Sequence, residues 1–570
     1  MLEKQIASYR ECIKRTKACE GQTFFAEYDG HSYCVLHFPS NEKKDEFEGA
    51  IRKKLDVHDL NFQGVWFPDW YRFSEAKFDE KVDFSSAVFN NLQSFSGSKF
   101  VSDAIFAGAT FKEEAIFGGS TFEKRADFTS VVFHKDAAFS SAKFEAIADF
   151  RDCVFMERAD FSRATFTIGS FWPATFNSPA SFYEARFTRA NFRVSEFKDT
   201  ASFSYCSFGH AEFIDTCFFK TADFFMAHFE GQAYFTSATF HEAVRFNMST
   251  FNAEARFTSA TFNGETDFNH SVLKSYVIFS GEYDHGGFGN NACCDFRHIE
   301  FELPGLVSFH SLTLRPQWFV NVNCRGFEFT DVRWMGNLRR EFIEEAVRDL
   351  TDRDAREERS AADRRAERRK QAELFFPRDA RALADLDKED AEAQARTANA
   401  ERIRNRFFRL LSITCRQLAV NAEESHRYDE ASEFRFWSME LRRKEGMRAR
   451  GRLSVGVLHS LYRYLSGYGE EIGRAFAILV GLWIFFAALY TQVGFVPTET
   501  SLQVPTYSNE VGSPQKLTKA VIYSLEVITL QQPNPRPLTP AARLAVAAER
   551  ILAPIQAALL ALAIRRRFIR

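Results

Sequence analysis

The stretch Phe111-Lys-Glu-Glu-Ala-Ile-Phe-Gly-Gly-Ser-Thr-Phe-Glu-Lys-Arg-Ala-Asp-Phe-Thr-Ser-Val-Val-Phe133 places phenylalanine at positions 111, 117, 122, 128 and 133. The steps alternate between six and five residues, so the pattern repeats every 11 residues. The same ladder runs from Phe62 to Phe279 and uses many of the 65 phenylalanines in this chain of 570 residues. The period is neither that of a helix face nor that of a strand, so it indicates a structural repeat.

A small residue often lies two positions before the phenylalanine, as in Ala126-Asp-Phe128 and Ala148-Asp-Phe150. Residues two apart on an extended segment face the same side, so the alanine and the phenylalanine point inward together. The aspartate between them is expected to face water. Because so short a unit cannot bury its phenylalanine alone, successive turns must stack on one another.

This pattern resembles the pentapeptide-repeat family, and the resemblance covers residues 62–334. It implies a right-handed quadrilateral β-helix whose turns have four five-residue sides. The six-residue steps depart from a strict pentapeptide and predict one extra residue at alternate corners. With two 11-residue units per turn and about 4.8 Å between stacked strands, residues 62–279 give about ten turns and a rod about 50 Å long.

The ladder lapses between Gly281 and Asn291, which we interpret as a loop. It returns as final turns and a cap, with a residue every five positions at Phe309, Leu314, Phe319, Cys324, Phe329 and Trp334. The family resemblance implies either a protein-binding surface or a mimic of DNA that binds topoisomerases. A mimic needs a strongly acidic face, whereas Arg and Lys are scattered through this repeat. We therefore expect a spacer and assembly scaffold over residues 61–335, and no nucleic-acid partner.

The N-terminal segment, residues 1–60, contains Cys12, Cys19, Cys34 and His37 in the spacing C-x6-C-x14-C-x2-H. Thiolate and imidazole are the ligands that tetrahedral zinc prefers. The segment Tyr33–Pro39 resembles a Cys/His segment found ahead of some pentapeptide repeats. These residues are candidate ligands of a structural zinc ion, since four protein ligands leave no position for a substrate; the alternative is four unrelated side chains. We expect mostly reduced cysteines, and no secretory signal in the polar start of the chain.

Residues 336–450 are expected to form a charged α-helical linker that contains a hairpin. The spacing of Phe408, Leu411, Cys415 and Leu418 predicts the apolar face of one helix. A second helix is predicted over Tyr428–Arg443, antiparallel to the first. The pair resembles the helical hairpins of protein-binding solenoids, so we expect an unidentified cytosolic protein partner. 

Two apolar runs follow, Ala475–Thr498 and Ala541–Ile564, and each is long enough to span a bilayer. Residues 451–473 mix tyrosines with charges and predict an interfacial amphipathic elbow. The basic end beginning at Arg565 favours a cytoplasmic C-terminus. We therefore expect an inner-membrane protein with two transmembrane helices in residues 474–570 and its N-terminal bulk in the cytoplasm.

The segment between these runs resembles the pore region of two-transmembrane potassium channels. The resemblance rests on Tyr523-Ser-Leu-Glu526, Thr529, Pro537-Leu-Thr539 and Arg543-Leu544, in that order. It implies a re-entrant pore helix and a homotetramer, because a two-helix pore domain needs four copies to enclose a pathway.

The filter position departs from the potassium pattern, because Leu530-Gln-Gln-Pro-Asn-Pro535 has no glycine and two prolines. A ring of carbonyls needs the conformational freedom of glycine, so a potassium-type filter is not expected. The candidate pore-lining residues are Glu526, Thr529, Gln531, Gln532 and Asn534.

The last helix adds two candidates, Glu549 and Pro554. Ionisable groups at membrane depth are functional candidates, which applies to Glu549 and to Glu526. The alternative for Glu526 is a carboxylate bonded to the loop backbone, and for Glu549 an ion pair with Arg550 or Arg543. Pro554 is a position where an inner helix could kink.

Two functions fit these observations. The first is an ion channel or channel-like protein whose cytosolic repeat senses or recruits a partner. The second is a membrane-tethered scaffold whose pore-like module conducts nothing. The sequence contains no nucleophile–base pair, phosphate loop or open metal site that we recognise, so we do not expect an enzyme.

Overall fold

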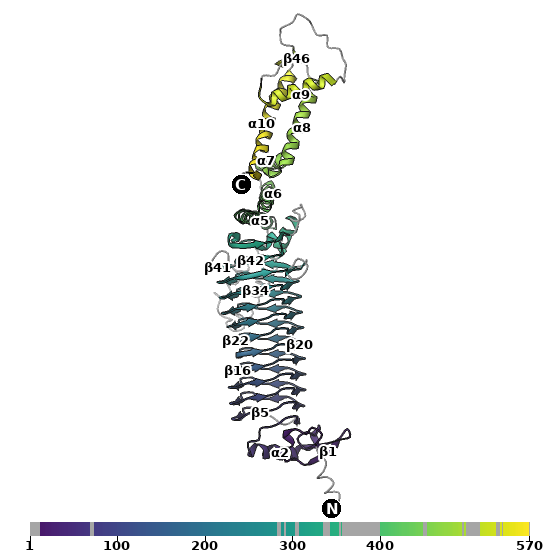
Figure 1. Cartoon of the computed structure of the whole chain (residues 1–570), viewed down its shortest axis with the longest axis vertical. Helices are drawn as coiled ribbons and strands as arrows, with labels where there is room; N and C mark the ends of the chain where they lie inside the picture. Colours follow the sequence, from purple (N-terminus) through teal and green to yellow (C-terminus); the bar gives the residue numbers. More distant parts are fainter. Residues whose placement is uncertain are drawn as a thin grey trace, which may run out of the picture. The chain divides into compact units, whose positions relative to one another are not determined.

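The computed structural model describes residues 12–68, 73–281, 287–289, 292–302, 307–334, 343–352, 355, 400–448, 453–492, 495–496, 514–531, 536–537 and 540–568. The chain divides into two compact units, Met1–Gly336 and Asn337–Arg570. Each unit is described by itself below (Figure 1).

The first unit begins with a small module ahead of the repeat. Its antiparallel hairpin pairs β1 (Phe24–Tyr28) with β2 (His31–Cys34). Short 3-10 turns η1 (Lys17–Cys19) and η2 (Asn41–Lys43) lie on either side of this hairpin in the sequence, and η2 leads into α2 (Lys44–Asp56).

The repeat forms a β-solenoid of short parallel strands (Figure 1). An 11-stranded sheet covers one side, a 10-stranded sheet a second side, and a 20-stranded sheet the other two. Each turn therefore has four sides, so the 11-stranded sheet marks 11 successive turns.

Each of the four sides of the solenoid has its own set of strands, in the chain order that follows. The first side contains β4 (Lys77–Phe78), β8 (Lys99–Phe100), β12 (Thr121–Phe122), β16 (Lys143–Asp149), β19 (Thr165–Ser170), β22 (Arg186–Asn191), β25 (Ser207–Phe208), β29 (His228–Phe229), β33 (Thr250–Phe251), β37 (Val272–Leu273) and β41 (Glu300–Phe301). The second side shares β16, β19 and β22, and adds β5 (Val82–Asp83), β9 (Ala104–Ile105), β13 (Ala126–Asp127), β26 (Ala211–Glu212), β30 (Ala233–Tyr234), β34 (Ala255–Thr258), β38 (Val277–Ser280), β42 (Val307–His310) and β44 (Phe327–Thr330). The third side contains β3 (Trp66–Phe67), β6 (Val88–Phe89), β10 (Thr110–Phe111), β14 (Val132–Phe133), β17 (Cys153–Phe155), β20 (Ala174–Phe176), β23 (Glu196–Phe197), β27 (Cys217–Phe218), β31 (Thr239–Phe240), β35 (Thr261–Phe262) and β39 (Gly287–Phe288). The fourth side contains β7 (Gln93–Ser94), β11 (Ala115–Ile116), β15 (Ala137–Ala138), β18 (Ala159–Asp160), β21 (Ala180–Ser181), β24 (Ala201–Ser202), β28 (Ala222–Asp223), β32 (Val244–Arg245), β36 (Glu265–Asp267) and β40 (Cys293–Asp295). The pair β43 (Thr313–Leu314) and β45 (Arg333–Trp334) completes the repeat.

The core of the solenoid is a set of phenylalanine columns. Phe122 is fully buried and stacks on Phe100 below it and Phe144 above it, with ring centroids 4.5 and 4.9 Å away. Phe122 also meets Phe128 of the next side edge to face, with ring centroids 5.9 Å apart. Ala126 and Ala148 are also fully buried, so the prediction that alanine and phenylalanine point inward together is confirmed.

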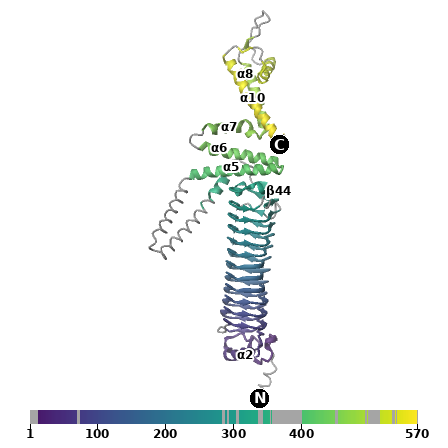
Figure 2. The ribbon, with the colours of Figure 1, turned by 90° about the vertical axis from the view of Figure 1, so that its left-hand side faces the viewer.

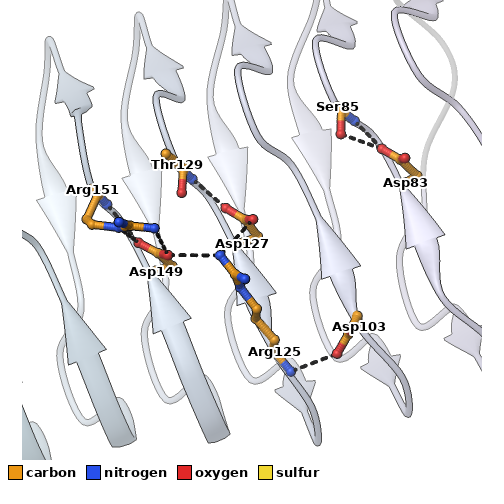
Figure 3. Close-up of polar contacts among 8 residues, drawn as sticks. All are labelled: Asp83, Ser85, Asp103, Arg125, Asp127, Thr129, Asp149 and Arg151. Atoms are coloured by element: carbon orange, nitrogen blue, oxygen red, sulfur yellow. Dashed lines mark hydrogen bonds and ion pairs between the residues drawn. The ribbon is translucent and has the colours of Figure 1, made fainter. Parts of the chain in front are cut away.

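The aspartate of the Ala-Asp-Phe unit does more than face water. The Asp127 carboxylate accepts a hydrogen bond from the backbone N–H of Thr129, 3.0 Å away. The next residue, Ser130, has a left-handed backbone conformation (φ 59°). Asp83 caps the same corner by accepting from Ser85 N–H (Figure 3). Because this carboxylate satisfies a donor at a tight turn, the aspartate is a turn residue as well as a solvated one.

The two kinds of step in the ladder correspond to two kinds of corner. Five-residue steps pass through a tight corner with one residue at positive φ, such as Ser86 or Ser130. Six-residue steps carry their additional residue at the other corners, as the sequence predicts. Where the step from Phe166 to Phe171 shortens to five, the register of β16 against β19 shifts between Phe144 and Ile147. 

The segment 281–291 is the one part of the repeat for which the sequence interpretation needs correction. We expected a loop there, but Gly287–Phe288 forms strand β39 on the 11-stranded side. Phe288 stacks on Phe262, 5.2 Å away, so the core column continues through the lapse in the sequence pattern. Residues 282–286 and 290–291 lie outside the described residues.

In the second unit residues 343–352 are helical, and an antiparallel helical hairpin follows, α5 (Ala400–Glu424) and α6 (Tyr428–Arg448) (Figure 2). The four residues predicted to form the apolar face of the first helix are all buried: Phe408, Leu411, Cys415 and Leu418. Ser412 and Ser438 exchange hydrogen bonds at the interface, and each hydroxyl donates to the other residue's carbonyl at 2.9 Å. Such small residues let the two helices approach closely.

The hairpin is followed by α7 (Leu453–Ser466), the turn η5 (Gly467–Gly469) and α8 (Ile472–Tyr490). Next come α9 (Pro514–Ile528) and α10 (Pro540–Phe568), and a two-residue pair of strands joins β46 (Phe495–Val496) to β47 (Arg536–Pro537). Among the described residues, Ile472–Tyr490 and Pro540–Arg565 are long and apolar enough to cross a membrane. The first of these helices ends eight residues before the apolar run does, ahead of Gly494 and Pro497 in the sequence.

Candidate functional site

The four predicted metal ligands come together in the N-terminal module. Their ligand atoms, the Sγ atoms of Cys12, Cys19 and Cys34 and Nδ1 of His37, all lie within 4.8 Å of one another. His37 Nδ1 lies 3.7, 3.3 and 3.1 Å from the three sulfur atoms in that order. The turn η1 and the β1–β2 hairpin therefore bring together four residues that are separated by 6, 14 and 2 residues in the sequence.

The second nitrogen of His37 is held as a metal-binding histidine requires. His37 Nε2 lies 2.9 Å from the carbonyl oxygen of Gln63 and 3.2 Å from Thr16 Oγ1. Donation from Nε2–H to a backbone carbonyl fixes the tautomer that leaves Nδ1 free to ligate, which is a common arrangement at metal sites. A Cβ on Gly64 would lie 3.3 Å from His37 Nε2, so the glycine leaves room for the ring.

The donor set fits a soft divalent metal ion. Hydrogen bonds with Cys19 lower the pKa of Cys12, while hydrogen bonds with Cys12 raise the pKa of Cys34, so the three thiols cannot all ionise together without a cation. A bound cation removes this conflict because it ligates all three thiolates. With three thiolates and one imidazole the tetrahedral positions are filled, which makes the site structural in character.

A buried lysine joins this module to the first turn of the solenoid. Lys43 is fully buried, and its Nζ donates to the carbonyl oxygens of Leu36, 3.1 Å away, and Trp66, 2.7 Å away. Trp66 N–H in turn donates to Leu36 O at 3.0 Å, so the module pairs with the open edge of the 11-stranded sheet. The module is therefore the N-terminal cap of the solenoid. Burial lowers the pKa of Lys43 to about 6.

The acidic residues on the side of the solenoid are largely paired with arginine. Arg125 donates to Asp127 and to Asp149, both at 3.1 Å, and Arg151 donates to both oxygens of Asp149 (Figure 3). Asp127 and Asp149 thus each have a guanidinium group beside them. This part of the surface is not a free acidic face of the kind that a DNA mimic needs.

The predicted pore residues lie at the end of α9, where the structure describes part of the loop. Glu526 is half-buried, and Thr529 donates from its hydroxyl to Leu525 O at 2.8 Å, inside the helix. Leu530 has φ 60°, and Gln531 follows it as an exposed residue. Gln532 and Asn534 lie outside the described residues.

The described part of this loop is tied to α10 by Arg550. Its guanidinium donates to the carbonyl oxygen of Gln531 at 3.0 Å. Strand β46 lies in the chain segment before α9 and strand β47 in the segment after it, and the two strands pair antiparallel. α9 therefore packs against both membrane-length helices, and the loop after its C-terminal end is bonded to α10.

Glu549 is fully buried where α8, α9 and α10 meet. Tyr490 donates its hydroxyl to Glu549 Oε2 at 2.5 Å, and Ser524 donates to Glu549 Oε1. These partners replace the ion pair with Arg550 or Arg543 that was the alternative in the sequence analysis. One carboxylate thus joins three helices. Pro554 lies within α10, half-buried and one turn further on.

Several residues that hold the sites together carry no local signal in the sequence. Tyr490 and Ser524 lie 59 and 25 residues from Glu549, and Lys43 lies in an ordinary charged stretch. Only an acidic residue inside an apolar run, as at Glu549, draws attention by itself. Its partners become visible only when the helices are packed.

The comparisons with known proteins bear on the solenoid. A family model that describes nine copies of the pentapeptide repeat matches residues 73–121, 84–132, 128–175 and 227–272. Comparison with curated proteins and with solved structures found no match. The matched residues coincide with turns in which the phenylalanine columns and parallel strands are continuous. The solenoid of this chain is therefore built from pentapeptide repeats.

Proposed function

We propose that the protein is an ion channel or channel-like membrane protein, with a cytosolic pentapeptide-repeat domain that senses or recruits a protein partner. The observation that carries this proposal is the packing of the short helix α9 against two membrane-length helices, α8 and α10, with Glu549 joining all three. A short helix that lies between two membrane-length helices in the sequence and packs against both supports the resemblance to a pore module. The glycine-free loop after it makes the pore one of a type other than potassium.

The proposal includes several features of assembly. In it α9 is re-entrant, the chain assembles as a homotetramer around the loop that contains Gln531, and the solenoid coils with a right hand. The basic residues that begin at Arg565 favour a cytoplasmic C-terminus, and an even number of crossings then leaves the N-terminal bulk on the same side of the inner membrane.

The second candidate is a non-conducting, membrane-anchored scaffold. The burial of Glu549 favours it, because this carboxylate is satisfied inside one protomer and faces no pathway there. The two prolines of the loop favour it as well, since they fix the backbone where a filter would need to vary.

We also propose that the N-terminal cluster binds zinc. Three sulfur atoms and Nδ1 of a tautomer-fixed histidine match the tetrahedral Cys3His set, and no ligand position remains for chemistry. In this role the metal supports the module that caps the solenoid. We propose no catalytic activity for it.

Single-channel recording of the purified full chain in a planar bilayer tests the channel. We expect discrete openings whose conductance or reversal potential changes in Glu526→Gln and Gln531→Ala. Gln492→Ala is the matched control, because Gln492 is an exposed glutamine that follows α8 and lies outside the α9 loop. Silence of a preparation shown to be tetrameric and inserted would reject spontaneous conduction in favour of the scaffold.

A further inference from the structure

The buried side of α6 carries a carboxylate that belongs to three elements at once. Glu440 is 4% exposed and accepts hydrogen bonds from Arg443 on its own helix, at 3.0 and 2.6 Å. It also accepts from Arg463 of α7 at 3.2 Å and from the Tyr468 hydroxyl of η5 at 3.0 Å. Burial by itself would raise the pKa of Glu440, yet the guanidinium groups hold it below its ordinary value. The Glu440 carboxylate therefore keeps its negative charge, and its hydrogen bonds hold it in one position.

Tyr468 is held from both sides. Its backbone has φ 62°, a conformation that residues other than glycine and asparagine seldom adopt, and the residue is fully buried. The ring meets Phe436 of α6 at 5.4 Å and Tyr462 of α7 at 5.7 Å. A second polar contact lies beside it, where Ser432 of α6 donates to Glu470 at 2.7 Å. The hairpin is thus bonded to the turn that leads into the first membrane-length helix.

A glutamine makes the corresponding contact from the other side. Gln556 of α10 is 1% exposed, and its Nε2 donates to Leu465 O and to Ala475 O, both at 2.8 Å. These carbonyls belong to the end of α7 and the first turn of α8. Gln556 lies two residues after Pro554, whose missing N–H leaves one carbonyl of the preceding turn without its helical donor. This is the part of α10 most open to a change in direction.

The outer face of α7 is not restrained in the same way. Its apolar residues are strongly exposed: Val457, Leu458, Leu461 and Tyr464. Within the protein, α7 is therefore held from its inner side, by bonds that include those to Glu440 and Gln556. A shift of α6 would carry Glu440 and Arg443 together away from Arg463 and from the buried Tyr468 hydroxyl, which would lose their acceptor, so the hairpin and α7 should move together.

We infer that α7 and η5 form a joint through which the α5–α6 hairpin sets the position of the cytoplasm-proximal half of α10, with Glu440 and Gln556 as positioning residues on its two sides. The inference rests on the geometry of the second unit and on its proposed place in the membrane, and it holds whether or not that unit conducts. Through this joint, a movement of the α5–α6 hairpin would change the position of part of α10 in the membrane.

Hydrogen exchange measured by mass spectrometry on the full chain in lipid nanodiscs tests this joint. In Glu440→Gln we expect amide exchange in residues 557–563 of α10 to rise by about tenfold or more, together with exchange in α7. Glu433→Gln is the matched control, because Glu433 lies on the same helix as Glu440, is exposed and takes part in none of the bonds described above. A Glu440→Gln effect confined to α6 and α7 would overturn the inference.

If Glu440→Gln fails to fold, Tyr468→Phe replaces it, because this change removes one bond to Glu440. A second variant tests the joint from the side of α10. Gln556→Leu should raise exchange in residues 557–563 and leave α6 unchanged. Combined with either hairpin variant, it should raise exchange in α10 no further than Gln556→Leu alone, because both cut the same connection. Additive effects would mean two independent contacts and would overturn the inference.

Discussion

The solenoid and the three helices α8, α9 and α10, which we propose to lie in the membrane and call the membrane unit, are held together in different ways. In the solenoid each phenylalanine stacks on its equivalent one turn away, so the same apolar contact recurs from Phe67 to Phe329. In the membrane unit the outward faces are apolar, and single buried polar groups such as Glu549 join the helices. Stability is therefore spread over many equivalent contacts in the first region and concentrated in a few in the second.

The Cys/His cluster, proposed above as a metal site, is where the first region departs from this rule, and loss of its metal should have the largest effect. Structural zinc contributes about 10–16 kcal/mol of apparent binding free energy in small domains. We expect Cys34→Ser, or chelation, to release the metal and to expose residues 12–60 to hydrogen exchange while the middle of the solenoid stays protected. Metal analysis and exchange measurements on the full chain check this.

The matched control for the cluster is Cys153→Ser. Cys153 is buried in the solenoid, where its thiol donates to Phe128 O at 2.9 Å, a bond that a serine hydroxyl can also make. It should retain full metal content. Equal metal content in Cys34→Ser and the parent would remove the cluster as a metal site.

Truncation of one ring in the solenoid core should come next. Phe150 is fully buried and stacks on Phe128 and Phe171, so Phe150→Ala should cost about 3–5 kcal/mol in the free energy of unfolding. Phe219→Ala removes an equally large but exposed ring and should cost far less. Denaturant unfolding of the two variants measures the difference. Similar losses in both would contradict a core made of stacked columns.

The buried Lys43 should give the cap a characteristic pH dependence. Burial lowers its pKa to about 6, against an ordinary value of 10.5, and the charge of Cys34 opposes this shift only in part. Between these values the unfolded cap binds more protons than the folded cap, so its stability rises with pH, by up to about 1.4 kcal/mol per pH unit.

Lys43→Met isolates this contribution, because the parent and the variant share every other titrating group. We expect exchange protection of residues 44–56 to increase from pH 7 to pH 9 more steeply in the parent than in the variant. Identical pH slopes in the two proteins would show that Lys43 keeps its charge in the folded cap.

The smallest expected effect lies in the membrane unit. Interhelical hydrogen bonds in membranes are worth about 0.6 kcal/mol on average and up to about 1.7 kcal/mol. Tyr490→Phe should therefore destabilise the unit by about 1 kcal/mol, measured by thermal unfolding in nanodiscs. In a Glu549→Gln background the same change should cost less, since the acceptor has already been altered. An undiminished cost would show that the hydroxyl acts through another partner.

The same contrast explains how much could be predicted from the sequence. The phenylalanine ladder predicts the columns, the alternate corners and the small inward residues because every contact in the repeat is periodic. The spacing of Phe408 and Leu418 predicts the hairpin for the same reason. The strand at Gly287–Phe288 was missed because its phenylalanine falls off the ladder behind an insertion.

The membrane unit was predicted less completely because its decisive contacts are not periodic. The two spanning runs follow from length and composition alone. The partners of Glu549, Glu440 and Gln556 lie on other elements, up to 91 residues away, and no spacing rule connects them. The cluster of Cys12 and His37 lies between these cases, since residue type predicts the ligands and only the fold brings them together.

The shortened corner after Phe166 has a consequence for engineering. One residue is lost there, yet Phe171 still stacks on Phe150 at 4.9 Å and on Phe192 at 4.7 Å. Gly169 helps to close this corner, because a Cβ there would lie 2.9 Å from the ring of Phe187. The length of the chain at this edge is thus independent of the packing inside. Foreign peptides, epitopes or labelling tags can be inserted at the six-residue corners of neighbouring turns, where the solenoid would display them at regular intervals along one edge.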